Sequence, residues 1–303
     1  MMKPKRLQKG DTVGIIAPSG IPQPEKLEKG LIFLNELGLK LKLGRHVYDK
    51  YGYLAGTDID RLEDLHTMFE DPEVKAIFCA RGGYGAARLA PMINYSLIQN
   101  NPKILWGYSD ITFLHLAIGK HTGLVTFHGP MLASDFGNEF VEEQTKQSIT
   151  QLFDSNPVNI SSNNEQSVID GYAFGPLIGG NLTLLTSSLG TKFELDTTGK
   201  VLLIEEIKEQ PRAVDRMLNQ LYMAGKLTDC SGILIGDFHE CTADSGPSFS
   251  TEEVILHYLR LANKPAMKGF KVGHCSPNLA VPLGVNAMID TRKQEVLIES
   301  GVL

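Results

Sequence analysis

The sequence predicts an α/β protein with two domains, in which a doubly wound, mainly parallel N-terminal sheet precedes a smaller, mixed α/β C-terminal domain. Three observations carry this prediction. The chain has 303 residues, enough for two domains of ordinary size. Short apolar runs alternate with segments of helical periodicity in the first half. A polar stretch then separates that half from a second series of such runs.

The first half supplies strands and helices in alternation. A buried strand is expected at residues 12–17, closed by Pro18, and a helix follows up to Leu37. Behind residue 58 a second helix should bury a face of apolar residues spaced three, three and four apart: Ile59, Leu62, Leu65 and Phe69. Strands at 74–79 and 103–107 complete the pattern of a parallel sheet with helices on both faces.

Residues 154–170 are polar and lack periodicity, so they are expected to link an N-terminal domain, 1–153, to a C-terminal domain, 171–303. In the second domain strands are expected at 201–207, 232–238, 270–273 and, as a terminal pair, around 287–298. An amphipathic helix is expected between them, with Pro211 in its first turn.

Composition excludes several classes of function. The formal net charge is −6, which argues against a nucleic-acid-binding protein. The basic start of the chain, Met1 to Arg6, is not followed by an apolar segment, so no export signal is predicted and the cytoplasm is the expected location. No run of apolar residues is long enough to span a membrane. The four cysteines are far apart in sequence and are expected to be reduced: Cys79, Cys230, Cys241 and Cys275.

Ser109 is the first candidate for chemistry. It lies where the strand ending at Gly107 runs directly into an apolar helix. Such a turn exposes a side chain at the carboxyl edge of a parallel sheet and places backbone N–H groups beside it. The spacing is not a full G-x-S-x-G, because Ile111 occupies the place of the last glycine. On this pattern alone, a serine that simply caps a helix is the more common interpretation.

A glycine-rich segment, residues 81–85, follows the strand that ends at Cys79. Its backbone N–H groups could approach a phosphate or a developing oxyanion, although a tight turn is an equally good explanation. The nucleotide-binding patterns G-x-x-x-x-G-K-[ST] and G-x-G-x-x-G are absent, so no cofactor is expected.

Two acidic residues and a histidine follow predicted strands of the second domain. Glu205 and Glu206 end the apolar strand, and alternation lets only one of them face a given site, although solvated carboxylates are the common case at a strand end. His274 has the pKa range of a general base, but single histidines are often structural. The tightest cluster of metal-ligand types in the sequence is Asp237, His239, Glu240 and Cys241. It lacks the H-E-x-x-H pattern, so no metal site is expected.

Six blocks occur in the order seen in one family: 81–85, 107–112, 127–130, 179–182, 205–216 and 273–284. Across roughly residues 10 to 290 the chain resembles the LD-carboxypeptidases, also called muramoyltetrapeptide carboxypeptidases. The resemblance implies a flavodoxin-like N-terminal domain, a site between the two domains, no metal or other cofactor, and a homodimer. One departure is Cys275, where a glycine commonly follows the histidine of the family.

The same resemblance implies roles for individual residues. Ser109 matches the nucleophile, Glu205 the orienting carboxylate and His274 the base, and the backbone N–H groups of Gly83 and Asp110 match the oxyanion donors. The implied reaction is hydrolysis of the bond between an L-centre and the terminal D-alanine of a murein tetrapeptide during cell-wall recycling.

Two other functions stay open. Microcin C self-immunity peptidases belong to the same family and cleave a peptide–nucleotide conjugate, but their chains tend to be longer between the nucleophile and the glutamate. A non-catalytic ligand binder would keep the fold without the chemistry, and the presence of all three candidate residues argues against it.

Overall fold

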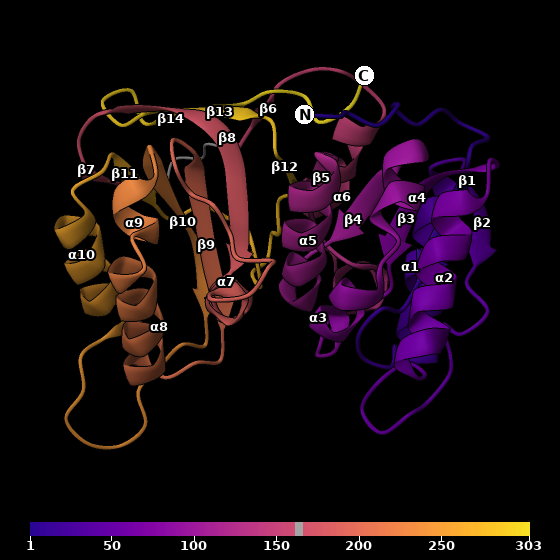
Figure 1. The fold of residues 1–303 in the computed structure, drawn as a ribbon, viewed down its shortest axis with the longest axis horizontal. Helices are drawn as coiled ribbons and strands as arrows, with labels where there is room; N and C mark the ends of the chain where they lie inside the picture. Colours follow the sequence, from indigo (N-terminus) through magenta and orange to yellow (C-terminus); the bar gives the residue numbers. More distant parts are fainter. Residues whose placement is uncertain (161–165) are drawn as a thin grey trace.

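The computed structural model describes residues 1–160 and 166–303. It contains two lobes that lie side by side, the N-terminal one mainly in indigo to magenta and the C-terminal one mainly in salmon pink, orange and yellow (Figure 1). Five residues of the expected linker, 161–165, lie outside the described residues. Short strands stand at both ends of that gap, so the described part of the polar stretch is more regular than its composition predicts.

The first lobe alternates strands and helices as expected. Its elements are β1 (Thr12–Ile16), α1 (Pro24–Glu36), β2 (Lys40–Leu43), α2 (Asp58–Glu70), β3 (Val74–Cys79), α3 (Ala86–Leu89), η1 (Ala90–Met92), α4 (Tyr95–Asn100), β4 (Ile104–Gly107), η2 (Ser109–Ile111), α5 (Thr112–Thr122), β5 (Thr126–His128), η3 (Leu132–Phe136), α6 (Glu143–Gln147) and η4 (Ser148–Leu152).

The second lobe is a mixed α/β structure. Its elements are β6 (Val158–Asn159), β7 (Gln166–Ile169), β8 (Tyr172–Asn181), α7 (Leu182–Ser188), β9 (Val201–Ile207), α8 (Pro211–Met223), α9 (Lys226–Asp229), β10 (Gly232–His239), α10 (Thr251–Ala262), β11 (Ala266–Lys268), β13 (Asn286–Asp290) and β14 (Glu295–Ile298), while β12 (Val281–Leu283) joins the other lobe.

Within the described residues the first sheet has six strands in the order β12-β5-β4-β3-β1-β2. The strands β2, β1, β3, β4 and β5 run parallel, in the strand order of flavodoxin-like folds. One face is covered by α1 and the other by α2 and α5, so the sheet is doubly wound as predicted. Only β12 is antiparallel, and it pairs with β5 at the edge.

The second sheet, counted over the described residues, has eight strands in the order β6-β14-β13-β8-β9-β10-β11-β7. The four strands from β8 to β11 are parallel, and the outer strands pair antiparallel. This confirms the mixed sheet, with β9 buried in its middle. Helix α8 begins at Pro211, as its proline and amphipathic spacing predict.

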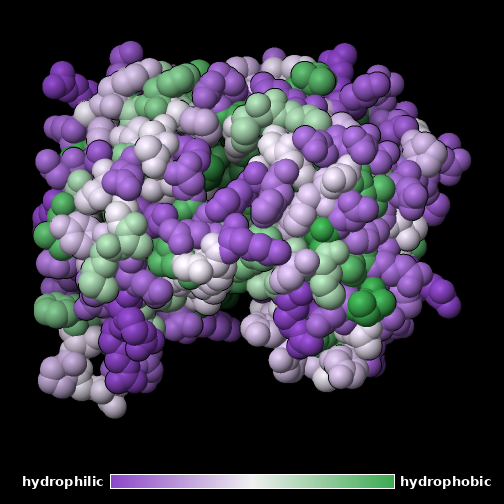
Figure 2. Space-filling view, in the orientation of Figure 1, coloured by the Kyte–Doolittle hydropathy of each residue, from purple (hydrophilic) through white to green (hydrophobic). Residues whose placement is uncertain are grey.

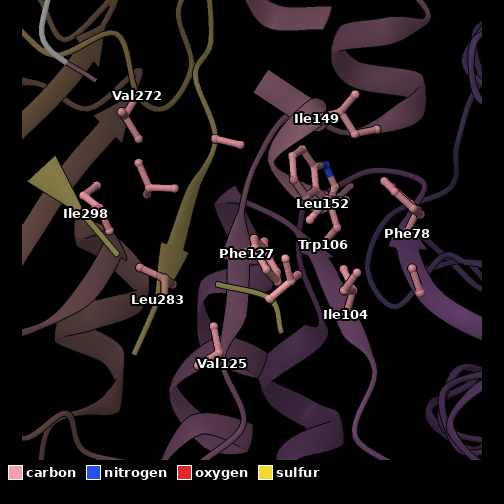
Figure 3. Close-up of a cluster of buried hydrophobic side chains, with 14 of the residues drawn as sticks. Phe78, Ile104, Trp106, Val125, Phe127, Ile149, Leu152, Val272, Leu283 and Ile298 are labelled. Carbon is pink, nitrogen blue, oxygen red and sulfur yellow. The ribbon is translucent and has the colours of Figure 1, made fainter. Parts of the chain in front are cut away.

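One hydrophobic core crosses from one lobe to the other. Trp106, Phe127 and Leu283 of the first sheet share it with Val272 and Ile298 (Figure 3). All except Leu283, which is 6% exposed, have at most 1% of their surface exposed. The two lobes are therefore packed together on one side. On the opposite side a hollow separates them at the lower edge of Figure 2.

Two sequence predictions about elements are wrong in detail. The strand expected at 270–273 is absent: β11 ends at Lys268, and Gly269 has a φ of 97°, which takes the chain out of strand geometry. In α2 the buried face includes Leu65 and Phe69, but Ile59 is 61% exposed. Arg61 is buried instead, because its guanidinium donates to the backbone carbonyl oxygens of Pro18 and Gly85.

Candidate active site

Ser109 is the first residue of η2, at a sharp turn between β4 and the helical segment that continues into α5. Its φ is 63°, in the left-handed region that side chains other than glycine seldom adopt. It makes no side-chain cap for the helix that follows, so the interpretation as a simple helix cap is wrong. The turn aims the hydroxyl away from the helix, as a strand-to-helix elbow does in α/β hydrolases.

The hydroxyl begins a chain of contacts that joins the two lobes. Ser109 Oγ lies 3.0 Å from His274 Nε2, and His274 Nδ1 lies 2.7 Å from Glu205 Oε2. A carboxylate can only accept a hydrogen bond, so the Glu205 contact places a proton on Nδ1 and leaves Nε2 able to accept from the serine hydroxyl. Residues separated by 165 and 69 positions in sequence are thus brought together.

Burial and charge at His274 act in opposite directions. Burial disfavours the charged imidazole, whereas the negative charge of Glu205 and its hydrogen bond favour it. The carboxylate prevails, and the pKa of His274 is raised above its ordinary value of 6.5. The site thereby stabilises the imidazolium that forms when the histidine accepts a proton.

The two neighbouring glutamates have different surroundings, as strand alternation predicts. Both are buried, so the interpretation of solvated strand-end carboxylates is wrong. Glu205 contacts His274, and its Oε1 has no hydrogen-bond partner among the described residues. Glu206 faces the other side and accepts from Asn181 Nδ2, from Thr183 N and Oγ1, and from its own neighbour Ile207 N, at 2.7 to 2.8 Å. Glu206 therefore ties β9 to the start of α7.

The glycine-rich loop after β3 passes directly over Ser109. A Cβ on Gly82 would lie 3.0 Å from Ser109 Cβ and 3.2 Å from Oγ, so a larger residue would crowd the hydroxyl. Gly83 has a φ of 121°, which favours glycine. The Asp110 carboxylate fixes this loop, since its Oδ2 accepts from Ser19 Oγ at 2.6 Å and from Ala86 N at 2.8 Å.

A second polar network holds the loop that carries His274. Asp135 Oδ1 accepts hydrogen bonds of 3.2 Å from Tyr108 and from Asn278, and Asn278 Oδ1 in turn accepts from Gly273 N at 3.1 Å. The Tyr108 ring lies 4.8 Å from the imidazole, centroid to centroid. Sequence reasoning missed Asp135, Asn278 and Ser19, because a lone polar residue in a loop carries no periodic signal.

The possible metal ligands that lie closest together in the sequence, at positions 237–241, do not form a common site. Asp237 and Glu240 lie on either side of His239, at 3.6 and 3.4 Å from different ring nitrogens. Among the described residues, the ligand atoms that do converge belong to His46, Asp49 and Asp60, within 4.8 Å of one another. One oxygen of each aspartate already has a protein partner: Asp49 Oδ2 lies 2.6 Å from His46 Nδ1, and Asp60 Oδ2 accepts from Thr57 N and Oγ1. All four cysteines are free thiols, as predicted. No helix in the described ranges is long and apolar enough to cross a bilayer.

The fold and these contacts define a two-lobed α/β protein in which a serine, a histidine and a glutamate meet between the lobes. Family models identify it further. The model described as the LD-carboxypeptidase N-terminal domain matches residues 13–129, and that of the LD-carboxypeptidase C-terminal domain matches residues 174–289. The chain belongs to the LD-carboxypeptidase family, and it is a carboxypeptidase.

Individual relatives cover almost the whole chain. A probable murein peptide carboxypeptidase of Bacillus subtilis is 54% identical over 99% of this chain and 95% of its own. The murein tetrapeptide carboxypeptidase of Pseudomonas aeruginosa is 33% identical over 92% of both chains.

Solved structures agree with the fold. Muramoyltetrapeptide carboxypeptidase from Oxalobacter formigenes superposes with a TM-score of 0.82 at 27% identity, covering 95% of this chain and 97% of its own. The microcin C7 self-immunity protein MccF in its wild-type apo state superposes with a TM-score of 0.91 at 27% identity, covering 99% and 98%.

Proposed function

We propose that this protein is a serine-type LD-carboxypeptidase that removes the terminal D-alanine from murein tetrapeptides in cell-wall recycling. One observation carries the proposal: an unbroken set of contacts runs from the buried Glu205 carboxylate through His274 to the Ser109 hydroxyl. The N-terminal domain, 1–153, supplies the nucleophile, and the C-terminal domain, 171–303, supplies the other two residues.

In the proposed mechanism, His274 Nε2 takes the hydroxyl proton as Ser109 Oγ attacks the scissile carbonyl carbon. The tetrahedral oxyanion is stabilised by the backbone N–H groups of Gly83 and Asp110. The imidazolium then gives its proton to the amine of the departing alanine. Water repeats the sequence on the acyl-enzyme, and Glu205 stabilises the charged imidazole in both halves.

The relatives support the choice of substrate. The Bacillus subtilis and Pseudomonas aeruginosa proteins are both named for murein peptides. Nearly full coverage of both chains means that the two proteins share both domains with this chain.

The decisive experiment compares matched synthetic peptides. We expect free D-alanine from a tetrapeptide that ends in an L-centre joined to D-alanine, and far slower cleavage when the terminal alanine is L or when the peptide ends in D-alanyl-D-alanine. Inverting the terminal centre displaces the scissile carbonyl, and a misplacement of about 1 Å can cost on the order of a hundredfold in rate. Similar kcat/KM values for the D- and L-terminated tetrapeptides would contradict the assignment.

Two alternative functions are tested together with the proposed one. MccF superposes closely on this chain, so a peptidyl-nucleotide conjugate is offered in the same assay, and its preferred cleavage would favour an immunity-type peptidase. A ligand binder without catalysis would fail to react with a fluorophosphonate, whereas the proposed enzyme is labelled stoichiometrically at Ser109.

The family resemblance also supports a cytoplasmic homodimer as part of the proposal. Sedimentation analysis of the purified chain tests the dimer, and fractionation of cells tests the location. A monomer at micromolar concentration would contradict the first, and recovery outside the cytoplasm the second.

A further inference from the structure

A small polar pocket lies beside the glycine-rich loop, at the carboxyl edge of the first sheet. Its volume is about 180 Å³, and its lining residues are Gln23, Lys26, Arg81, Ala133 and Ser134. Arg81 follows β3, and its Nη1 donates to Ile21 O, which follows β1. The strand order reverses between β1 and β3, the point where folds of this order commonly bind ligands.

The pocket carries positive charge that is not neutralised. Within the described residues neither Lys26 nor Arg81 forms an ion pair, and Lys26 Nζ only donates to the Asn138 side chain at 3.2 Å. Arg81 Nε and Nη1 donate to backbone carbonyls, which hold the guanidinium in place. Its Nη2 has no hydrogen-bond partner in the described ranges. A fixed guanidinium edge with a free donor suits a carboxylate.

Distance places this cation within reach of the reacting bond. Arg81 Nη2 lies 3.8 Å from the position of a Cβ built on Gly83, and a Cβ built on the adjacent Gly82 would lie 3.2 Å from Ser109 Oγ. In a peptide substrate the terminal carboxylate carbon is only about 3–4 Å from the scissile carbonyl carbon, since two bonds separate the amide nitrogen from it. A carbonyl held at Ser109 would therefore put its terminal carboxylate beside the pocket.

We propose that this pocket binds the free α-carboxylate of the terminal residue, with Arg81 as the specificity residue and Lys26 as a supporting charge. The inference rests on the proposed function and names how that site selects a chain end. A peptide that continues beyond the scissile bond has an uncharged amide at this position and leaves both cations without a partner. The pocket thus favours removal of one terminal residue over internal cleavage.

The test uses the full chain and two tetrapeptides that differ only at the end, one with a free carboxylate and one with a carboxamide. For the wild type we expect kcat/KM to be about ten- to hundredfold higher for the acid, the range of a hydrogen bond to a charged group. Arg81→Gln should bring the acid-to-amide ratio close to one, Arg81→Lys should restore part of it, and Lys26→Gln should lower it severalfold. Lys29→Gln is the matched control, because Lys29 is exposed on the same helix without lining the pocket.

Several results would overturn the proposal. Equal losses for acid and amide in Arg81→Gln, with slower fluorophosphonate labelling of Ser109, would mean that Arg81 only supports the loop. If Arg81→Gln does not fold, Lys26→Gln provides the test, because the Lys26 side chain is exposed and its replacement should leave the fold intact. An unchanged acid-to-amide ratio in Lys26→Gln would then overturn the proposal. If a variant instead loses a preference between peptides with diaminopimelate and peptides with lysine as the third residue, the pocket would bind the side-chain carboxylate of diaminopimelate and the proposal would be wrong. No D-alanine release by the wild type would remove the proposed function and this subsite together, whereas release with an unaltered ratio in the variants removes the subsite alone.

Discussion

The adjacent glutamates of β9 allow one substitution to be compared with its neighbour. Glu205→Gln and Glu206→Gln each replace one buried carboxylate oxygen with an amide NH₂ and leave the shape of the side chain almost unchanged. Glu205 contacts His274, while Glu206 accepts four hydrogen bonds from backbone and side-chain donors. We expect the first change to damage catalysis and the second to damage stability.

The catalytic loss follows from the lost charge. With a contact of 2.7 Å between Glu205 Oε2 and His274 Nδ1, the two charge centres lie roughly 4 Å apart. At an effective dielectric constant of about 20 their attraction is about 4 kcal/mol, or about a thousandfold in rate if it is lost when the imidazolium forms. Glutamine can still accept from Nδ1, so the fold should be retained.

The stability loss follows from the donors around Glu206. Each carboxylate oxygen accepts two hydrogen bonds, so an NH₂ in place of either oxygen faces two donors. At about 1.5–3 kcal/mol per bond to a charged group, offset by the lower cost of burying an amide, the loss should be about 2–4 kcal/mol. For a protein of this size that lowers Tm by roughly 3–6 °C.

The assay measures D-alanine release and the thermal transition for both variants and the wild type. Glu205→Gln should lose about three orders of magnitude in kcat/KM with a small change in Tm, and Glu206→Gln should show the larger fall in Tm with most of its rate retained below the transition. Equal catalytic losses, or a Glu206→Gln variant that is as stable as the wild type, would refute the reasoning.

Three further outcomes are expected. Ser109→Ala should retain less than a few per cent of the wild-type kcat, and turnover in this variant or in Ser109→Gly would exclude Ser109 as the nucleophile. Ser109→Gly should be more stable than Ser109→Ala by about 1 kcal/mol, because glycine accepts the φ of 63° without strain. Since His274 must be neutral to accept a proton and its pKa is raised by Glu205, with Asp135 and Glu206 contributing, kcat/KM should rise with pH through a midpoint above 6.5. In Glu205→Gln that midpoint should move to lower pH; a midpoint below 6.5 in the wild type would show that another group controls the rate. EDTA should leave the rate unchanged, because His274 activates the nucleophile, and a loss of activity restored by zinc would contradict this.

Much of the fold could be predicted because the apolar runs coincide with buried strands. Residues 201–207 form β9 over the expected range, and the Pro211 signal marks the start of α8. The failures occur where tertiary contacts decide. Ile59 fits the helical period of its segment, but it lies in the first turn of α2, and the buried Arg61 takes the inward position there.

At the candidate site, the local sequence indicated Ser109, Glu205 and His274 as candidates, but it could not predict which residues surround them. The turn at Ser109 could be expected from the strand and helix on either side of it. The burial of Glu206 could not, because it depends on Asn181 and Thr183 from a neighbouring strand and helix. Asp135 is a similar case, since its partners Tyr108 and Asn278 are distant in sequence.

Strand β12 comes from the C-terminal part of the chain but belongs to the first sheet, and this limits how the gene could be divided. His274 lies between β11 in one sheet and β12 in the other, so the chain that carries it is anchored in both lobes. A fragment that ends before residue 154 would leave the edge of β5 without Val281–Leu283 and present unpaired backbone groups to other molecules. A soluble version of the first lobe would have to carry residues 281–283 back as a fused strand, and a library that shuffles the lobes of relatives would need extra crossovers on both sides of β12, so that β12 comes from the same relative as β5.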